Sequence, residues 1–518
     1  MRSRFHPRVS VCASGIIVIL LSAALSAQET ANPQTSPQSP APSSGSLTPV
    51  FRSRTDLVLV PVVVRDHKGN HLPGLTKDAF RLQENGKDQA ISVFEENRPP
   101  AAEVEPSFAP DRGYSNLPFD NAKQLRYTIL VLDLLNTYPF QRTDSKDNLI
   151  KFLARGITGN QPVALVCITN QGLKQVQPFT TTPSVLIEAL KKLNVGPETI
   201  GARRDHVIGT MVQIRDIALA YAGIPGRKTM IFAAGFMPEI SSEAAINDSS
   251  LYAADLRRMW GALNSSNISV YIFLAMGWEH NTGGAVASLD LRMRSFADST
   301  GGGECIEAND LMNCLASAVE DSRSYYMLGF SVQPNDRKPG WRDLKVRVSA
   351  AHVEVHARDG FYYGQPAPST APAVRDQEIS ALASAVPYSA IPMFVKVLPP
   401  TASDPTAAAA KDNNNAKKKI QFMMTIPLDG ITIDPAQPNP LDLDVGAIAL
   451  TRDTREAAEF VHPVRGNPKP ENPEAWARDG IKVQTELDLP PGFYDLRFFV
   501  RDNNTGQIGT VVFPLEVK

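Results

Sequence analysis

Hydrophobic and polar positions follow a strand-and-helix rhythm in the middle of this chain. Short apolar runs alternate there with longer segments in which apolar residues recur every three or four positions. The runs predict buried strands, and the wider spacing predicts helices with one apolar face, which together are typical of a parallel sheet covered on both sides. The expected strands are 127–132, 163–168, 229–233, 270–274 and 325–330, and the expected helices are 144–154, 184–193, 205–221, 251–263, 289–296 and 310–322.

A period-two alternation flanks this block on both sides. It appears within residues 51–100, where Glu84-Asn85-Gly86 between two alternating runs predicts a hairpin. The same alternation returns within residues 332–365. We expect the later strands to complete the N-terminal β unit, so that the α/β domain, residues 122–331, is inserted between β strands.

The C-terminal part predicts a second, all-β unit. Proline and alanine dominate a linker at 366–388, and residues 99–118 form another proline-marked linker. Residues 389–518 then contain six apolar runs of strand length, at 391–398, 419–428, 443–451, 483–488, 494–500 and 510–517. The predicted fold class is therefore α/β plus β: a doubly wound, mostly parallel sheet inserted between β strands, followed by an immunoglobulin-like β-sandwich.

The first residues predict export. Arginines precede an apolar stretch that ends in Ala-Leu-Ser-Ala, which is typical of a signal peptide over residues 1–27. Residues 28–50 are mostly Pro, Ser, Thr and Gln, which predicts a disordered tether. We expect a periplasmic or extracellular protein without a transmembrane segment after cleavage. A retained membrane anchor is the alternative, although the apolar run is shorter than the roughly 20 residues that span a bilayer.

Charge and cysteine content narrow the classes further. The 52 basic and 54 acidic residues give a net charge of −2 without long blocks of one sign, which argues against nucleic acid as a partner. Three cysteines follow the signal segment, and Cys167 lies in an apolar strand pattern. Cys305 and Cys314 form either a short-loop disulfide, as an exported compartment permits, or two free thiols.

Candidate chemistry concentrates where the first strand of the α/β block ends. The stretch VLDLLNT places Asp133, Asn136 and Thr137 at the carboxyl edge of the sheet, where open α/β sheets bind ligands. A carboxylate and two small polar residues at this edge resemble half of a metal site.

The central block, with its flanks at 72–86, 226–228, 326–330 and 357–363, resembles the exported proteins of acidobacteria that are related to von Willebrand factor type A (vWA) domains. The resemblance covers roughly residues 50–365. It implies a non-enzymatic protein-binding or adhesion module, and it implies the fold of a vWA domain. Many vWA domains hold a divalent cation in a metal-ion-dependent adhesion site, with an Asp-x-Ser-x-Ser loop, a later threonine and an aspartate after the fourth strand.

Matched to that pattern, the site is degenerate. Asp133, Thr137 and Thr199 stand at three ligand positions, while Leu135 and Ala234 replace an expected serine and aspartate. One carboxylate is too little to hold a strongly hydrated cation tightly, so we expect weak binding of Mg²⁺, Mn²⁺ or Ca²⁺ or none. In one alternative, Asp133 and Thr137 tie the turn through backbone N–H groups.

A third alternative for the same edge is that Asn136 and Asp144 supply replacement oxygens. No serine-hydrolase elbow, zinc-protease motif, phosphate loop or dinucleotide fingerprint occurs in the sequence, so we expect no catalytic residues and no cofactor.

The leading interpretation is that loops at the sheet edge bind another protein or a cell-envelope component. A hydrolase-type enzyme using Asp133 and Asp144, and a purely architectural envelope protein, are the alternatives. The candidate contact residues are Tyr138, Phe140, Phe236, Met237, Trp278 and His280.

Overall fold

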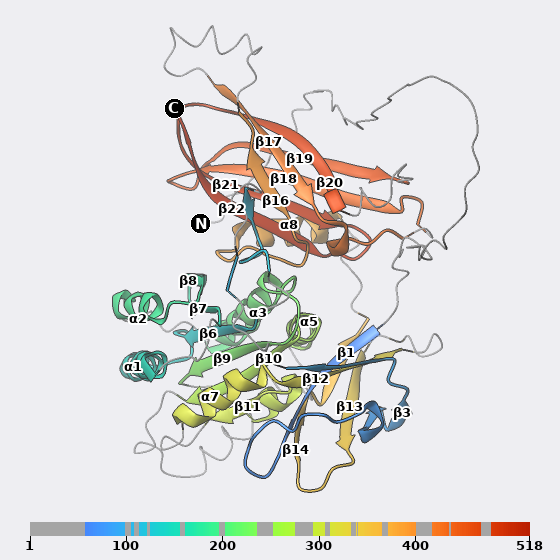
Figure 1. Ribbon diagram of the computed structural model, residues 1–518. Helices are drawn as coiled ribbons and strands as arrows, with labels where there is room; N and C mark the ends of the chain where they lie inside the picture. Colours follow the sequence, from blue (N-terminus) through green and yellow to red (C-terminus); the bar gives the residue numbers. More distant parts are fainter. Residues whose placement is uncertain are drawn as a thin grey trace, which may run out of the picture.

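The chain folds into three units that lie next to one another (Figure 1). Strands from both ends of the first two-thirds of the chain, blue and yellow in the figure, form one β unit beside the green α/β unit, and the orange-red β unit lies on the other side. The computed structural model describes residues 57–98, 105–107, 113–121, 125–155, 161–195, 203–235, 252–274, 294–305, 311–332, 338, 340–364, 371–399, 417–434, 437–467 and 478–518. The predicted signal peptide and tether lie outside these ranges.

The first β unit consists of two four-stranded sheets, with the orders β14-β1-β12-β4 and β15-β13-β2-β3. Its pairings join segments that are far apart in sequence, because β1 pairs with β14 and β2 pairs with β13. The two sheets enclose one apolar core. The elements are β1 (Leu57–Arg65), η1 (Lys77–Ala79), β2 (Phe80–Glu84), β3 (Lys87–Gln89), β4 (Val93–Asn97), β12 (Tyr325–Ser331), β13 (Gly340–Val348), β14 (Glu354–Ala357) and β15 (Gly360–Tyr363).

The hairpin predicted at Glu84-Asn85-Gly86 is confirmed. β2 and β3 pair through Glu84 and Lys87, and Asn85 and Gly86 between them both have positive φ, at 47° and 76°. Two consecutive residues of this conformation make the tight turn whose twist matches a hairpin.

The prediction that residues 325–330 form the last strand of the α/β sheet is wrong. β12 pairs with β1 and β4 in the first β unit. Six of its seven residues are buried, because it is a central strand with covered faces. A central antiparallel strand of this kind has the same unbroken apolar pattern as a buried parallel strand, so the pattern alone does not assign it to a sheet.

The α/β unit is a six-stranded sheet in the order β11-β10-β9-β6-β7-β8. All its pairings are parallel except that of the edge strand β8 with β7. The first strand, β6, therefore lies at the centre, and the strand order reverses between β6 and β9, which defines the topological switch point. The strands are β6 (Tyr127–Asp133), β7 (Val163–Thr169), β8 (Gly172–Thr180), β9 (Lys228–Ala234), β10 (Ile268–Leu274) and β11 (Gly303–Cys305).

Helices cover both faces of this sheet. Apolar side chains of α1, α2 and α7 pack on one face, and those of α3 and α5 pack on the other, so the sheet is doubly wound as predicted. The prediction missed β8 and β11, and it placed the start of the first helix five residues too late. The helices are α1 (Pro139–Arg155), α2 (Pro183–Lys192), α3 (Arg203–Ala220), α5 (Ala253–Ser265) and α7 (Leu311–Asp321), and residues 294–300 are also helical.

The C-terminal unit also consists of two four-stranded sheets, with the orders β20-β17-β16-β5 and β19-β18-β21-β22, around one core. Both segments predicted as linkers contain structure: β5 (Tyr114–Ser115) pairs with β16, and α8 (Ala371–Ala383) lies in the range 366–388. The immunoglobulin-like topology stays a prediction. The remaining elements are β16 (Phe394–Val397), β17 (Lys418–Ile426), η7 (Leu428–Gly430), β18 (Leu441–Thr451), β19 (Glu456–Gly466), β20 (Ile481–Leu489), β21 (Gly492–Asp502) and β22 (Ile508–Val517).

Within the described ranges, none of the helices combines the length and the apolar character needed to cross a membrane.

Candidate functional site

Asp133 ends β6 at the switch point of the sheet, where the sequence places the first ligand of an adhesion site. Its side chain is fully buried. One carboxylate oxygen accepts the backbone N–H groups of Leu135 and Asn136, both at 2.9 Å, and the other accepts the Asn136 side-chain amide at 2.6 Å. The turn itself therefore supplies three donors to this carboxylate.

Burial changes the acidity of this group. The pKa of Asp133 is raised to about 6, chiefly because burial disfavours the charged carboxylate, and the donors from Asn136 and Leu135 and the charge of Arg142 oppose the rise. The side chain therefore changes its protonation state closer to neutral pH than an exposed aspartate does.

The side chains of Thr137 and Leu135 are engaged in contacts within the protein. The Thr137 hydroxyl accepts the backbone N–H of Gly235 at 2.8 Å, which ties the turn to the end of β9. Leu135 packs against the core beneath α3. Ala234, at the position of the expected aspartate, is buried at the end of β9. These contacts agree with the alternative in which Asp133 and Thr137 tie the turn through backbone N–H groups.

The remaining candidate ligands are Thr199, Asp144 and Asn136. Thr199 lies outside the described residues, so its part in the site stays a prediction. Asp144 lies on α1 and is exposed, whereas Asp133 is buried, and among the described residues no hydrogen bond or ion pair joins Asp144 to the turn. Asn136 directs its amide nitrogen at Asp133 and at the Thr210 hydroxyl, 2.7 Å away, and so acts as a donor at both contacts.

Sequence reasoning missed Arg142 and Thr210, which complete this turn. Arg142 is buried and donates to the backbone oxygens of Thr137 at 2.8 Å and Leu134 at 2.7 Å. Thr210 accepts from Asn136 and donates to the His206 carbonyl oxygen. Arg142 would have attracted notice only if α1 were expected to begin at Pro139, because that start places it in the first turn beside the strand end.

One predicted contact residue is described at this edge. Tyr138 follows the turn directly and is 55% exposed. The side chain of Phe140 and all of Phe236, Met237, Trp278 and His280 lie outside the described part of the structure.

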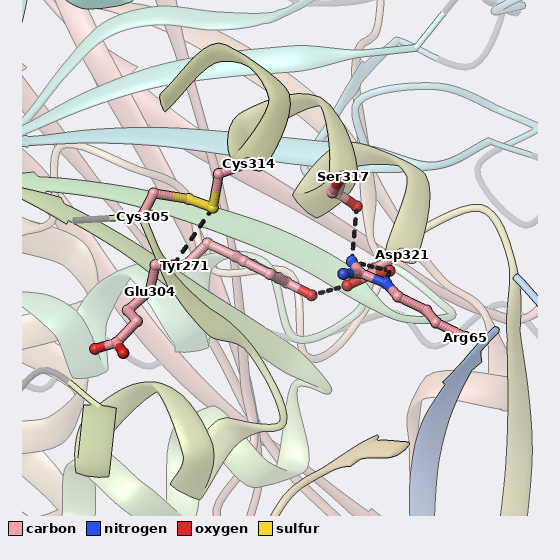
Figure 2. Close-up of a disulfide and its surroundings, with 7 residues drawn as sticks. All are labelled: Arg65, Tyr271, Glu304, Cys305, Cys314, Ser317 and Asp321. Atoms are coloured by element: carbon pink, nitrogen blue, oxygen red, sulfur yellow. Dashed lines mark hydrogen bonds and ion pairs between the residues drawn. A yellow bond between two sulfur atoms is a disulfide. The ribbon is translucent and has the colours of Figure 1, made fainter. Parts of the chain in front are cut away.

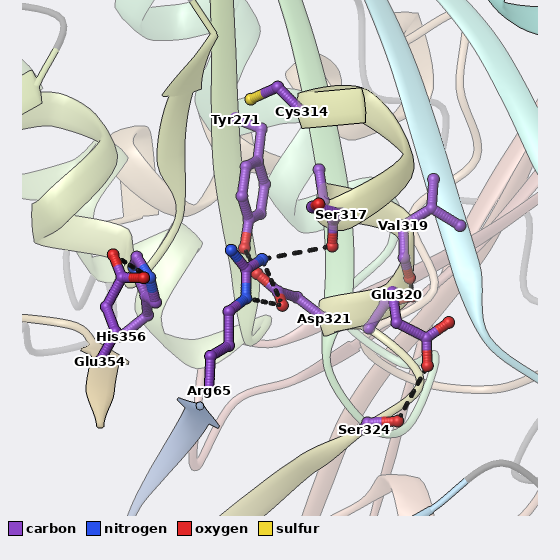
Figure 3. Close-up of polar contacts among 12 residues, drawn as sticks. Arg65, Tyr271, Cys314, Ser317, Val319, Glu320, Asp321, Ser324, Glu354 and His356 are labelled. Atoms are coloured by element: carbon purple, nitrogen blue, oxygen red, sulfur yellow. Dashed lines mark hydrogen bonds and ion pairs between the residues drawn. The ribbon is translucent and has the colours of Figure 1, made fainter. Parts of the chain in front are cut away.

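A second polar site lies at the joint between the first β unit and the α/β unit. Asp321, at the end of α7, accepts from both Nε and an Nη of Arg65 in β1, at 3.1 and 2.6 Å, and from the hydroxyl of Tyr271 in β10 (Figure 3). Arg227 donates to the same Tyr271 oxygen at 3.2 Å and to the Gly301 carbonyl oxygen at 2.8 Å. Burial and the neighbouring Asp321 carboxylate raise the pKa of Tyr271.

A pocket of about 390 Å³ opens beside this ion pair. His71 lies in its wall with both ring nitrogens buried, and its Nε2 is 3.8 Å from the Glu96 carboxylate. Burial lowers the pKa of His71, and Glu96 opposes this shift. Arg65 and Asp321 neutralise each other in their ion pair. The other groups that line the pocket are neutral, except for the carboxylate of Glu320 and the titratable ring of His71. Its lining residues are Arg65, Gly69, Asn70, His71, Ala316, Ser317, Glu320, Asp321 and Ser324.

The two cysteines of uncertain state pair in the structure. Cys305 of β11 and Cys314 of α7 form a disulfide with their Cα atoms 5.7 Å apart (Figure 2). Cys167, in β7, is buried and lies outside this disulfide. Over the described residues, no group of three or more His, Cys, Asp or Glu side chains is arranged to hold a metal ion.

No family model and no curated protein matches this chain. Among solved structures, an aerotolerance-related membrane protein from Bacteroides fragilis is 13% identical with a TM-score of 0.24, and the match covers 38% of this chain and 98% of that one. The VWA domain of SpRpn10 is 14% identical with a TM-score of 0.23, covering 37% and 94%.

Proximal thread matrix protein 1 from the mussel byssus is 11% identical with a TM-score of 0.27, and the match covers 38% of this chain and 48% of the mussel protein, about half its length. The mussel protein is also known with zinc in its MIDAS motif. Because the TM-scores are below 0.5, neither the fold description nor the site rests on these matches.

Proposed function

We propose that this chain is an exported, non-enzymatic interaction module. In this proposal a vWA-like α/β domain presents the carboxyl edge of its sheet to another protein or a cell-envelope component, without an intrinsic metal ion at the contact. The two β units serve as its support and spacer.

One observation carries the proposal: the Asp133 carboxylate is buried and receives three hydrogen bonds from its own turn. A cation would have to displace the Asn136 amide, and it would find Leu135 and Ala234 where an adhesion site needs oxygen ligands. Contact at this edge therefore depends on the shape and the polar and apolar groups of the loops, of which Tyr138 is exposed.

The hydrolase alternative has less support from the candidate carboxylates. A pair of carboxylates that share acid and base work must lie within reach of one substrate, but Asp133 is enclosed in its turn and Asp144 faces solvent from α1. One feature favours the architectural alternative, in which the C-terminal unit makes the contact. Phe493 of this unit is 50% exposed and lies beneath the guanidinium of Arg452.

The first experiment is isothermal titration of Mg²⁺, Mn²⁺ and Ca²⁺ into the full chain, beside Asp133→Ala and the matched control Asp147→Ala, which removes an exposed carboxylate of α1. We expect no saturable binding by any of the three proteins. Binding that Asp133→Ala abolishes and Asp147→Ala preserves would overturn the metal-free mechanism and restore a metal-dependent adhesion site.

The second experiment tests the contact surface. The full chain is sedimented with a cell-envelope fraction in the presence and absence of a chelator, beside Tyr138→Ala and Phe493→Ala. We expect binding that is insensitive to the chelator and is weakened several-fold by Tyr138→Ala alone. Loss of binding with Phe493→Ala alone would favour the architectural alternative, in which the C-terminal unit makes the contact.

A further inference from the structure

The disulfide and the buried ion pair at the joint lie at opposite ends of one helix. Cys314 is in the first turns of α7, and Asp321 is its last residue. Seven residues correspond to about two helical turns, so the two side chains lie on the same side of α7, roughly 10 Å apart along its axis. Figure 2 shows the disulfide and the Arg65–Asp321 contact along this helix.

Each end ties α7 to a different unit. The disulfide joins α7 to β11, which pairs with β10 within the α/β sheet. Asp321 joins α7 to Arg65 in the first β unit, and the Ser317 carbonyl oxygen accepts from the same guanidinium at 3.5 Å. The position of one helix therefore decides whether the Arg65 guanidinium keeps its acceptors.

Tyr271 connects the two ties. Its backbone pairs with Gly303, two residues before Cys305, and its hydroxyl donates to Asp321. A shift of β11 or of the beginning of α7 would therefore move Asp321, the acceptor of Arg65, because both the helix and Tyr271 connect to it.

We propose that the Cys305–Cys314 disulfide is a redox control of this joint. In the oxidised form it holds α7 where Asp321 meets Arg65 and Tyr271. In the reduced form the beginning of α7 is released, the ion pair loosens, and the pocket wall formed by Ser317 and Glu320 separates from the turn that follows β1.

A dithiol reductant supplies both thiols that this reduction uses. Cys305 is 5% exposed and Cys314 is half-buried, so a thiolate of the reductant attacks the Sγ of Cys314. The S–S bond breaks, Cys305 leaves as a thiolate and takes a proton, and the second thiol of the reductant then releases Cys314. The protein gains two electrons and two protons, and the reductant becomes a disulfide.

The test is hydrogen–deuterium exchange by mass spectrometry on the full chain, with and without dithiothreitol. Closing a loop of about ten residues restricts the chain enough to slow opening up to roughly 100-fold, so we expect amides of α7 to exchange at least about 10-fold faster after reduction. We also expect faster exchange at residues 66–72, the turn that follows β1 and lines the pocket. The backbone amides of Asp66, Gly69 and Leu72 are hydrogen-bonded there.

Variants separate coupling from independent loosening. In oxidised Arg65→Gln the turn at 66–72 should already exchange fast, and reduction should add little there. Arg81→Gln, which removes an exposed ion pair with Asp88 in the same β unit, is the matched control and should behave as wild type. The double variant Cys305→Ser, Cys314→Ser should exchange as the reduced protein and should not respond to dithiothreitol.

Three results would overturn the proposal. In the first, dithiothreitol does not reduce the disulfide in the folded chain. In the second, reduction speeds amide exchange in α7 but leaves exchange at residues 66–72 unchanged, and in the third, reduction and Arg65→Gln each speed exchange at 66–72 and their effects add. If the double serine variant does not fold, wild type with dithiothreitol still distinguishes these outcomes. None of them depends on the proposed binding function.

Discussion

Asp133 and Asp321 are both buried aspartates next to the same sheet, but they are stabilised in different ways. Asp133 receives three neutral donors from the turn it begins. Asp321 receives a guanidinium from another unit and a phenol from β10. The first carboxylate organises residues within three positions of itself, whereas the second joins β1 and α7, 256 residues apart.

The difference shows what each aspartate can be expected to do. Neutral donors leave much of the cost of burying a charge uncompensated, and the pKa of Asp133 is accordingly raised to about 6. A guanidinium compensates the charge but makes the two residues depend on each other. Asp133 should therefore respond to pH, and Asp321 should respond to the loss of its partner.

The largest expected effect is that of Arg65→Met. It leaves the buried Asp321, 4% exposed at its side chain, without its charged partner, and breaking such a pair costs about 4 kcal/mol. Denaturant unfolding should show this loss relative to wild type. A loss below about 1 kcal/mol would mean that Tyr271 alone satisfies the carboxylate and that the pair contributes little to the joint.

The next effect is the pH dependence of Asp133. Its folded pKa of about 6 is above the ordinary 3.8, so as pH rises the unfolded chain loses the proton first and the folded state is favoured less. This contribution to stability is full below about pH 4 and is lost between pH 4 and 6, by about 3 kcal/mol.

Asp133→Asn removes this titration. Its unfolding free energy relative to wild type should therefore rise by about 3 kcal/mol between pH 4 and pH 7, measured by denaturant unfolding at each pH. An offset that does not change with pH would show that Asp133 titrates normally in the folded protein.

A smaller effect is expected from Thr210→Val. The substitution keeps the shape of the side chain but removes the acceptor that holds the Asn136 amide over Asp133, at a cost of about 1 kcal/mol. The pKa of Asp133, followed by the same pH series, should rise further if Asn136 then turns away from the carboxylate. An unchanged pH profile would show that Thr210 does not position Asn136.

The smallest effect is that of Asp144→Asn, which we expect to change the unfolding free energy by less than about 0.5 kcal/mol because this carboxylate is exposed on α1. A loss of several times this size would mean that Asp144 makes stabilising contacts in the folded protein in spite of its exposure.

The contrast between the two aspartates also separates what the sequence could predict from what it could not. Asp133 was found at the correct edge because an apolar run followed by polar residues is a local signal, and the hairpin at Asn85 was found for the same reason. Arg65 and Asp321 carry no such signal, since their pairing depends on how two distant units dock. β12 was assigned to the wrong sheet because both sheets bury their central strands.

At the candidate site, the sequence predicted the loss of oxygen ligands at Leu135 and Ala234, but it could not distinguish a vacant metal site from a self-contained turn. That distinction depends on the direction of the Asn136 amide and on the buried Arg142 guanidinium. The position of Arg142 follows from where α1 begins, and helix boundaries are less well determined by periodicity than the helices themselves.

The insertion of the α/β unit between β4 and β12 has a consequence for biosynthesis. The strands β1 to β4 leave the ribosome first, but β12 follows β4 by roughly 230 residues. At a translation rate of about 5–20 residues per second, the early strands wait on the order of 10 to 50 seconds for their partners. Throughout that interval the nascent chain carries apolar strands with unpaired edges, which are sites of wrong pairing and aggregation.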